Sequence, residues 1–145
     1  IYGSRRRIYR LKSSIMEAYY YLDSKYDVSE RDMSYDEAEP TVKLLLRQHV
    51  EDLVADLAAQ YYEGRREYSL KPEIDFIVTR RGRPIAVGEV KWGGYTNRDL
   101  ENFRSKTQAL PGLKIFVTRE KDRDRYKDVH LVDAEDLASL NLPRP

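Results

Sequence analysis

The spacing of apolar residues changes near residue 64, and this change limits the choice of fold more than any other feature. From Thr41 to Tyr62, apolar residues recur about every 3.6 positions and share one side of a helix. The members of this stripe are Leu46, Val50, Leu53, Val54, Leu57, Ala58 and Tyr61. One long amphipathic helix is therefore predicted, and Gly64 ends it. Beyond Gly64 apolar and polar residues alternate, which is typical of half-buried strands.

The part after Gly64 is predicted to hold five strands and two further helices. The strands are expected at 67–70, 74–79, 85–92, 113–118 and 129–132. One helix is expected from a cap at Thr96 or Asn97 to about Leu110, and another from Asp133 to about Leu140. From residue 41 the order is helix, three strands, helix, strand, strand, helix, which predicts an α/β protein with helices packed on a sheet.

The first 39 residues are predicted to form a separate N-terminal part. Residues 5–11 are expected to form a short basic strand, and a serine cap at 13 or 14 starts a short helix to about Leu22. Residues 23–39 hold seven acidic residues against two basic ones and are followed by Pro40, which is typical of a linker or an exposed loop. The main domain is therefore expected at 40–145.

Composition excludes several classes of protein. The chain has 145 residues, the length of one domain, and can bury enough surface to fold without a structural metal. It has no cysteine, which excludes a disulfide framework and a cysteine zinc site. Its apolar runs are too short to span a membrane, and no apolar stretch follows the N-terminal charges as in a signal peptide. A cytoplasmic protein is therefore expected.

The charge of the chain excludes one further class of function. The 26 basic and 25 acidic residues leave a net charge of only +1, so the chain lacks the strongly basic character of a general nucleic-acid binder. These charges accompany only three Gln and three Asn residues. High charge with few thermolabile amides is the pattern reported for heat-adapted proteins, which favours a thermophilic source.

The predicted hairpin of 74–79 and 85–92 brings two carboxylates together. If the strands pair about Gly82, Asp75 stands opposite Glu89 on the face away from Ile74, Phe76 and Val78. Opposed side chains lie about 5 Å apart at Cβ, so the two carboxylates repel each other. A divalent cation would offset this repulsion, and Mg²⁺ favours one or two carboxylates together with water and a phosphate.

Two further residues are candidates for the same site. Lys91 shares a face with Glu89 and would contact a scissile phosphate or a metal-bound water. Glu51 borders the stripe of the long helix and would point across the sheet. The plainer alternative is an exposed strand face on which Glu89 and Lys91 form a salt bridge and Asp75 pairs with Arg83 or Lys91.

Asp75 followed by Glu89-Val90-Lys91 after a hairpin, with a glutamate in the preceding helix, resembles the PD-(D/E)XK nuclease superfamily. The resemblance implies a restriction-endonuclease-like αβββαβ core with a central mixed sheet flanked by helices, and DNA as the substrate. It also implies Mg²⁺ or Mn²⁺ as cofactor. The implied metal ligands are Asp75, Glu89, the main-chain carbonyl of Val90 and the helix acid Glu51, and the implied catalytic lysine is Lys91. The family's proline is here Pro72, three positions before Asp75 rather than next to it.

A longer stretch, about residues 8–110, is similar to the nuclease-like C-terminal domain of archaeal P-loop ATPases. The similarity rests on Tyr9-Arg10-Leu11-Lys12, His49-Val50-Glu51-Asp52-Leu53, Glu73-Ile74-Asp75 and Gly88-Glu89-Val90-Lys91-Trp92. It implies that residues 1–12 are the last strand of a winged helix and that an ATPase domain is a partner. The chain departs from the family in having Tyr68 where tryptophans are usual, and it holds no Walker A motif.

Basic residues outside the triad are candidate DNA contacts. Arg80, Arg81 and Arg83 in the hairpin turn would grip a phosphate backbone, and Lys106 lies on the helix that follows the site. A metal-dependent DNA endonuclease is the function expected first. A non-catalytic DNA-binding or regulatory module of an archaeal ATPase is the alternative, and a second copy of the chain is a further candidate partner.

Overall fold

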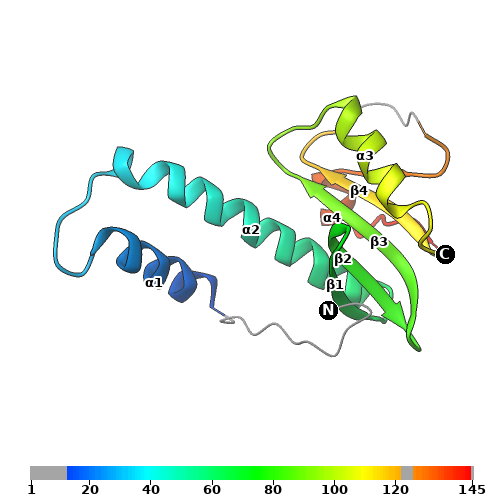
Figure 1. Ribbon diagram of the computed structural model, residues 1–145, viewed down its shortest axis with the longest axis horizontal. Coiled ribbons are helices and arrows are strands. Elements are labelled where there is room, and N and C mark those ends of the chain that lie inside the picture. The colour runs from blue at the N-terminus through cyan, green and yellow to red at the C-terminus, as the bar shows by residue number, and fades with distance from the viewer. Residues whose placement is uncertain (1–12, 122–125, 145) are drawn as a thin grey trace.

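The computed structural model describes residues 13–121 and 126–144 and shows an α/β protein whose five-strand mixed sheet packs against helices (Figure 1). The predicted order of elements from residue 41 onward is confirmed. The helices are α1 (Ser14–Tyr26), α2 (Tyr35–Tyr61), α3 (Asn97–Thr107) and α4 (Ala134–Ala138). The strands are β1 (Arg65–Leu70), β2 (Glu73–Arg80), β3 (Arg83–Lys91), β4 (Leu113–Thr118) and β5 (His130–Val132). In the part of the chain that is described, no helix has the length and apolarity needed to cross a membrane.

The acidic stretch is a linker only in its middle, so the prediction for 23–39 is wrong at both ends. Helix α1 continues to Tyr26, and α2 begins at Tyr35, before Pro40. Ser34 and Glu37 form a capping box, in which each side chain accepts a hydrogen bond from the other residue's backbone N–H. This cap starts the helix in spite of the acidic composition and of Pro40, which lies within the helix. The basic strand predicted at 5–11 lies outside the described residues.

The strands lie in the order β1-β2-β3-β4-β5, with β1–β2 and β2–β3 antiparallel and β3–β4 and β4–β5 parallel. The β2–β3 turn is shorter than predicted, because Arg80 and Arg83 are already paired. Arg81 and Gly82 both have positive φ, as a two-residue type I′ hairpin turn requires. The pair Phe76–Gly88 confirms the predicted register, which continues through the next two pairs before it shifts at the turn.

Alternation along β2 fails at one place. Between Glu67 and Ser69 of β1 the pairing with β2 shifts, because β2 carries one residue more than β1. The extra residue makes a β-bulge at Asp75 and Phe76. Ile74 accordingly packs with Ile77 in one core cluster, whereas Phe76 packs in the other. The prediction that Ile74 shares a face with Phe76 and Val78 is therefore wrong.

Two apolar clusters, one on each face, enclose the sheet. The C-terminal part of α2 covers one face, on which Phe76 lies over Gly88; a Cβ on Gly88 would come within 2.0 Å of the ring. Helix α3 covers the other face through Leu100 and Phe103. The sheet covers the side of α2 that carries Val54, Ala55 and Ala58. Leu46 and Leu53 of the predicted stripe lie on the other side and are exposed, contrary to expectation. Figure 1 shows the α1–α2 pair extending away from the sheet.

Candidate metal and phosphate site

The bulge in β2 places Asp75 beside the end of β3. The backbone N–H of Val90 donates a hydrogen bond of 2.7 Å to Asp75 Oδ2, just beyond the last β2–β3 backbone pair. Burial raises the pKa of Asp75 above its ordinary value. The Val90 hydrogen bond and the ammonium groups of Lys91 and Lys106 oppose this rise, whereas the charge of Glu89 adds to it. The charge of Glu89 thus acts on Asp75, although the β2–β3 pairing ends at Phe76–Gly88 and does not pair these two residues.

Glu89 is the buried acid of the site, with a relative exposure of 6%. Lys91 Nζ lies 3.0 Å from Glu89 Oε1, and the Lys106 ammonium contacts Glu89 Oε2. Oε2 is buried and makes this contact without hydrogen-bond geometry. Burial lowers the pKa of Lys91, but the hydrogen bond to Glu89 and the charges of Glu89 and Asp75 outweigh it, so the net pKa is raised. Lys91 is therefore an ammonium ion at neutral pH.

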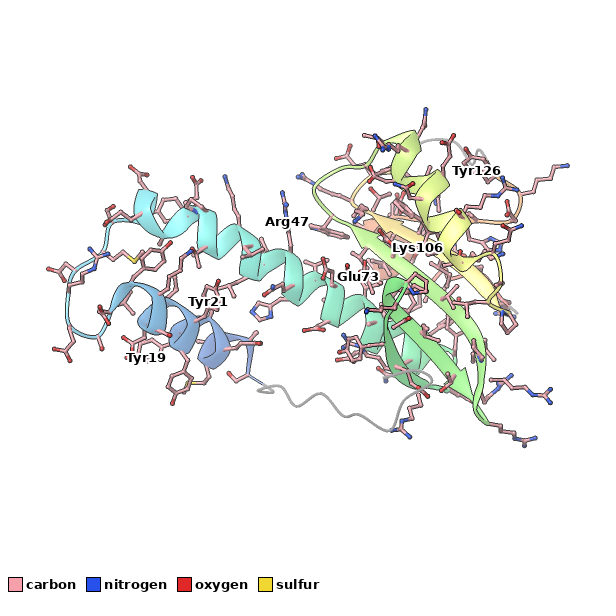
Figure 2. All side chains as sticks on the ribbon, viewed as in Figure 1. Tyr19, Tyr21, Arg47, Glu73, Lys106 and Tyr126 are labelled. Atoms are coloured by element: carbon pink, nitrogen blue, oxygen red, sulfur yellow. The ribbon has the colours of Figure 1, made fainter. Side chains whose placement is uncertain are left out.

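Lys106 reaches Glu89 from the last turn of α3, the helix that crosses over the sheet from β3 to β4 (Figure 2). The sequence predicted this lysine as a DNA contact, but the structure pairs it with Glu89 inside the site. Its position depends on the parallel β3–β4 connection, which folds α3 back over the strand that carries Glu89. Sequence spacing alone gives no sign of this contact.

Glu51 approaches the end of β3 from helix α2. It shares a pocket of about 180 Å³ with Arg47, Val90, Lys91, Trp92, Gly93 and Gly94. The prediction that this acid points across to the strand end is consistent with the pocket. Arg47 was not predicted, although it lies one helical turn before Glu51 and therefore on the same side of α2. Its guanidinium lies close to Gly93, where an added Cβ would come within 3.0 Å of Nη2.

The donor groups at this site are of the chemical types that bind a divalent cation. Asp75 and Glu89 supply carboxylate oxygens, of which Glu89 Oε2 is buried without a hydrogen bond. The N–H and C=O of one strand residue point to the same edge, so the Val90 carbonyl faces the Asp75 side as well. Across residues 13–121 and 126–144, however, no three acidic or histidine side chains are gathered closely enough to hold a metal ion. The residues that fit a metal ion are therefore two carboxylates and one carbonyl. Mg²⁺ bound by such ligands fills its remaining coordination positions with water.

The hairpin arginines lie at the other end of the strands. Arg83 begins β3 and Lys91 ends it, so the strand rise of ~3.3 Å per residue puts about 26 Å between them. Arg80, Arg81 and Arg83 are exposed and, with Glu63 and Ile85, surround an open hollow of about 830 Å³. The alternative in which Asp75 pairs with Arg83 is therefore wrong. The arginines remain predicted DNA contacts, but they contact no phosphate held at Glu89 and Lys91.

None of the family models, curated proteins and solved structures with which the chain was compared matches it. The chemistry proposed for the site therefore rests on its own residues.

Proposed function

We propose that the chain is a metal-dependent nuclease of the PD-(D/E)XK type, which hydrolyses phosphodiester bonds of DNA with Mg²⁺ or Mn²⁺. The observation that carries this proposal is the convergence of Asp75, Glu89 and Lys91 at one end of β2 and β3, with Glu89 buried. The element order α2, β1, β2, β3, α3, β4 is compatible with a restriction-endonuclease-like αβββαβ core. The desolvation of a buried ion pair offsets much of its attraction, so stability alone gives little reason for such a cluster.

Asp75, Glu89 and the Val90 carbonyl would hold the ion, and Glu51 would face it from α2. A bound divalent cation would lower the pKa of the water that it binds and would offer a positive charge to the phosphate oxygens. Arg47, on the same wall of the pocket as Glu51, provides a second positive charge at the mouth of the site. The site thus combines acidic ligands with basic groups able to neutralise a phosphate.

Lys91 would stabilise charge rather than remove a proton. Its raised pKa keeps it protonated at neutral pH, so it donates hydrogen bonds and accepts none. When Lys91 turns from Glu89 to a phosphate oxygen, Lys106 remains against Glu89 and keeps the buried carboxylate paired. Lys106 therefore acts as a positioning residue that frees Lys91 for the substrate.

The proposal is tested by cleavage of linear, single-stranded and branched DNA in Mn²⁺ and in Mg²⁺. Lys91→Ala and Asp75→Asn should each lower the cleavage rate by about 100-fold or more. Lys91→Ala removes a positive charge at the reacting phosphate, and Asp75→Asn weakens the binding of the ion that would stabilise it. Lys43→Ala, which removes an exposed lysine of α2, is the matched control and should cut like the unaltered chain. Urea unfolding of each variant shows whether a lost activity reflects a lost fold. No cleavage by the unaltered protein, together with no Mn²⁺ binding in calorimetry, would rule out the nuclease.

The alternative is a non-catalytic DNA-binding or regulatory module of a larger archaeal ATPase. One observation favours it: both oxygens of Glu89 already face lysines, so its charge is balanced without a metal. In this case DNA binding would be the same in EDTA and in Mn²⁺, and Asp75→Asn would leave it unchanged. The attachment to an ATPase rests only on the sequence resemblance.

A further inference from the structure

Exposed apolar side chains are concentrated on the α1–α2 pair. Of the eleven large apolar side chains that are exposed in the described part of the chain, ten lie on these two helices. Helix α1 has no buried residue at all. Figure 2 shows Tyr19 and Tyr21 on α1, well away from the sheet. Such a concentration on one projecting element is typical of an interaction surface rather than of scattered surface residues.

The exposed residues of α2 form a straight stripe. Tyr35, Val42, Leu46 and Leu53 follow one another at intervals of seven, four and seven residues, which places them within a narrow arc of the helix. Beside the stripe runs an apolar groove of about 210 Å³ between the two helices, to which α1 contributes Ile15 and Ala18. Leu46 is 57% exposed and Leu53 68% exposed. The spacing is that of a seam at which helices pack side by side.

The size of this surface matches what a dimer needs. Aromatic side chains each offer about 150–250 Å² when they are fully exposed, and the aliphatic ones offer somewhat less. Leu44 lies on another side of α2; at their observed exposures the other nine residues offer on the order of 1,000 Å². A stable interface of ordinary size buries about 800 Å² on each partner.

The charges at the two ends of α2 are opposite. The α1–α2 turn and the start of α2, residues 27–39, hold six acidic residues and one basic residue. At the other end, Glu63 follows α2 and lies beside the arginine cluster of the β2–β3 turn. Two copies of α2 laid antiparallel would bring the acidic end of each beside the basic end of the other. Helix α2 is 27 residues long, or about 40 Å, so the ends are well separated.

We propose that the groove and stripe of α1–α2 are covered by a second copy of this chain, in an antiparallel arrangement that makes a four-helix bundle with twofold symmetry. Leu46 and Leu53 flank the twofold axis, and the acidic turn of each copy faces the arginine cluster of the other. This interface lies apart from the Asp75–Glu89–Lys91 site, so the proposal stands or falls independently of the nuclease function.

Sedimentation of the full chain tests the dimer. The unaltered 17.1 kDa chain should sediment as a dimer at about 1–100 μM, where interfaces of this size associate. Leu46→Glu combined with Leu53→Glu should raise the dissociation constant by about 100-fold or more, as expected for central interface residues. Leu44→Glu is the matched control, because Leu44 is comparably exposed but lies on another side of α2. A monomer throughout this range, or equal dissociation by Leu44→Glu, would overturn the proposal.

A charge exchange tests the antiparallel arrangement. Glu30→Lys with Asp32→Lys, and separately Arg81→Glu with Arg83→Glu, should each weaken the dimer by about tenfold. The chain with all four substitutions restores opposite charges and should regain the original affinity to within about threefold. If it associates no better than either pair of substitutions, the two copies do not lie antiparallel.

Discussion

Glu89 lies in a place that water hardly reaches, and the ammonium groups of two lysines contact its carboxylate. Removal of one partner of a buried charge is strongly destabilising, because the other charge is left without compensation. If Lys106 is lost, Lys91 still contacts Glu89, which limits the loss of stability. The two lysines also differ in exposure, since the Lys106 side chain is 23% exposed and that of Lys91 is 38% exposed.

We expect Lys106→Ala to lower the free energy of unfolding by about 1–3 kcal/mol, because Glu89 loses its more buried partner. Lys43→Ala, which breaks an exposed pair within α2, should cost less than about 0.5 kcal/mol. Urea unfolding at neutral pH measures both. Glu89→Gln should remove most of the effect of Lys106→Ala in a double-mutant cycle. Equal costs for Lys106→Ala and Lys43→Ala would show that Lys106 does not stabilise Glu89.

The residues of the site could be predicted where they lie on neighbouring strands, and Glu51 was also predicted, from its place beside the stripe of α2. Asp75, Glu89 and Lys91 follow from the alternation and register of one hairpin, which depend on local sequence. Lys106 and Arg47 come from helices, and their place depends on how α3 and α2 pack on the sheet. The β-bulge at Asp75 was not predicted either, because it depends on pairing with β1.

At the scale of elements, a buried acid, Asp136, ties helix α4 to its neighbouring residues. Asp136 is 8% exposed; it contacts the Lys121 ammonium and accepts hydrogen bonds of 3.2 Å from the Asp133 N–H and from Asn141 Nδ2. Burial raises the pKa of Asp136, but these partners outweigh it and lower the pKa below the ordinary value. The ionised form therefore stabilises the folded state.

Because this folded-state pKa is lowered, the stabilisation is present above the unfolded-state pKa of about 3.9 and is lost as the pH falls through the folded-state value. Asp136→Asn should therefore cost about 1–3 kcal/mol at pH 7. The cost should shrink steadily as the pH falls below about 4. Urea unfolding at several pH values measures it, with Glu73→Gln, at an exposed position outside the proposed dimer surface, as the control. A cost that does not depend on pH would contradict the assignment.

The elements themselves could largely be predicted, since the change from helical to alternating spacing locates α2 and the strands. The start of α2 was missed because composition was given more weight than the Ser34–Glu37 cap. The exposure of Leu46 and Leu53 was missed for another reason. A periodic stripe indicates which side of a helix is apolar, but not how much of that side the rest of the chain covers.

At the scale of the whole molecule, stability is unevenly distributed. The central strands are buried on both faces of the sheet, whereas α1 packs mainly against α2 and buries no residue. Regions with few buried apolar contacts open at low free-energy cost.

Amide hydrogen exchange should therefore be slowest in β2 and β3 and fastest in α1. The Leu46→Glu, Leu53→Glu chain is the suitable sample, because association then adds no protection to α1. In the unaltered chain, α1 should exchange more slowly as the protein concentration rises. Equal protection of α1 and β3 in the double variant would contradict this distribution of stability.

The parallel pairing of β3 with β4 also has a consequence for synthesis. Asp75, Glu89 and Lys91 are synthesised before residues 113–118, the strand that completes the sheet beside β3. Until then α3 has no completed sheet to pack on, and Lys106 is not held against Glu89. We expect a nascent chain stalled near residue 110 to carry Asp75, Glu89 and Lys91 but not to hold Lys106 against Glu89. The order of synthesis thus delays the assembly of this cluster, because Asp75, Glu89, Lys91 and Lys106 are all made before β4, the strand that completes the sheet under α3.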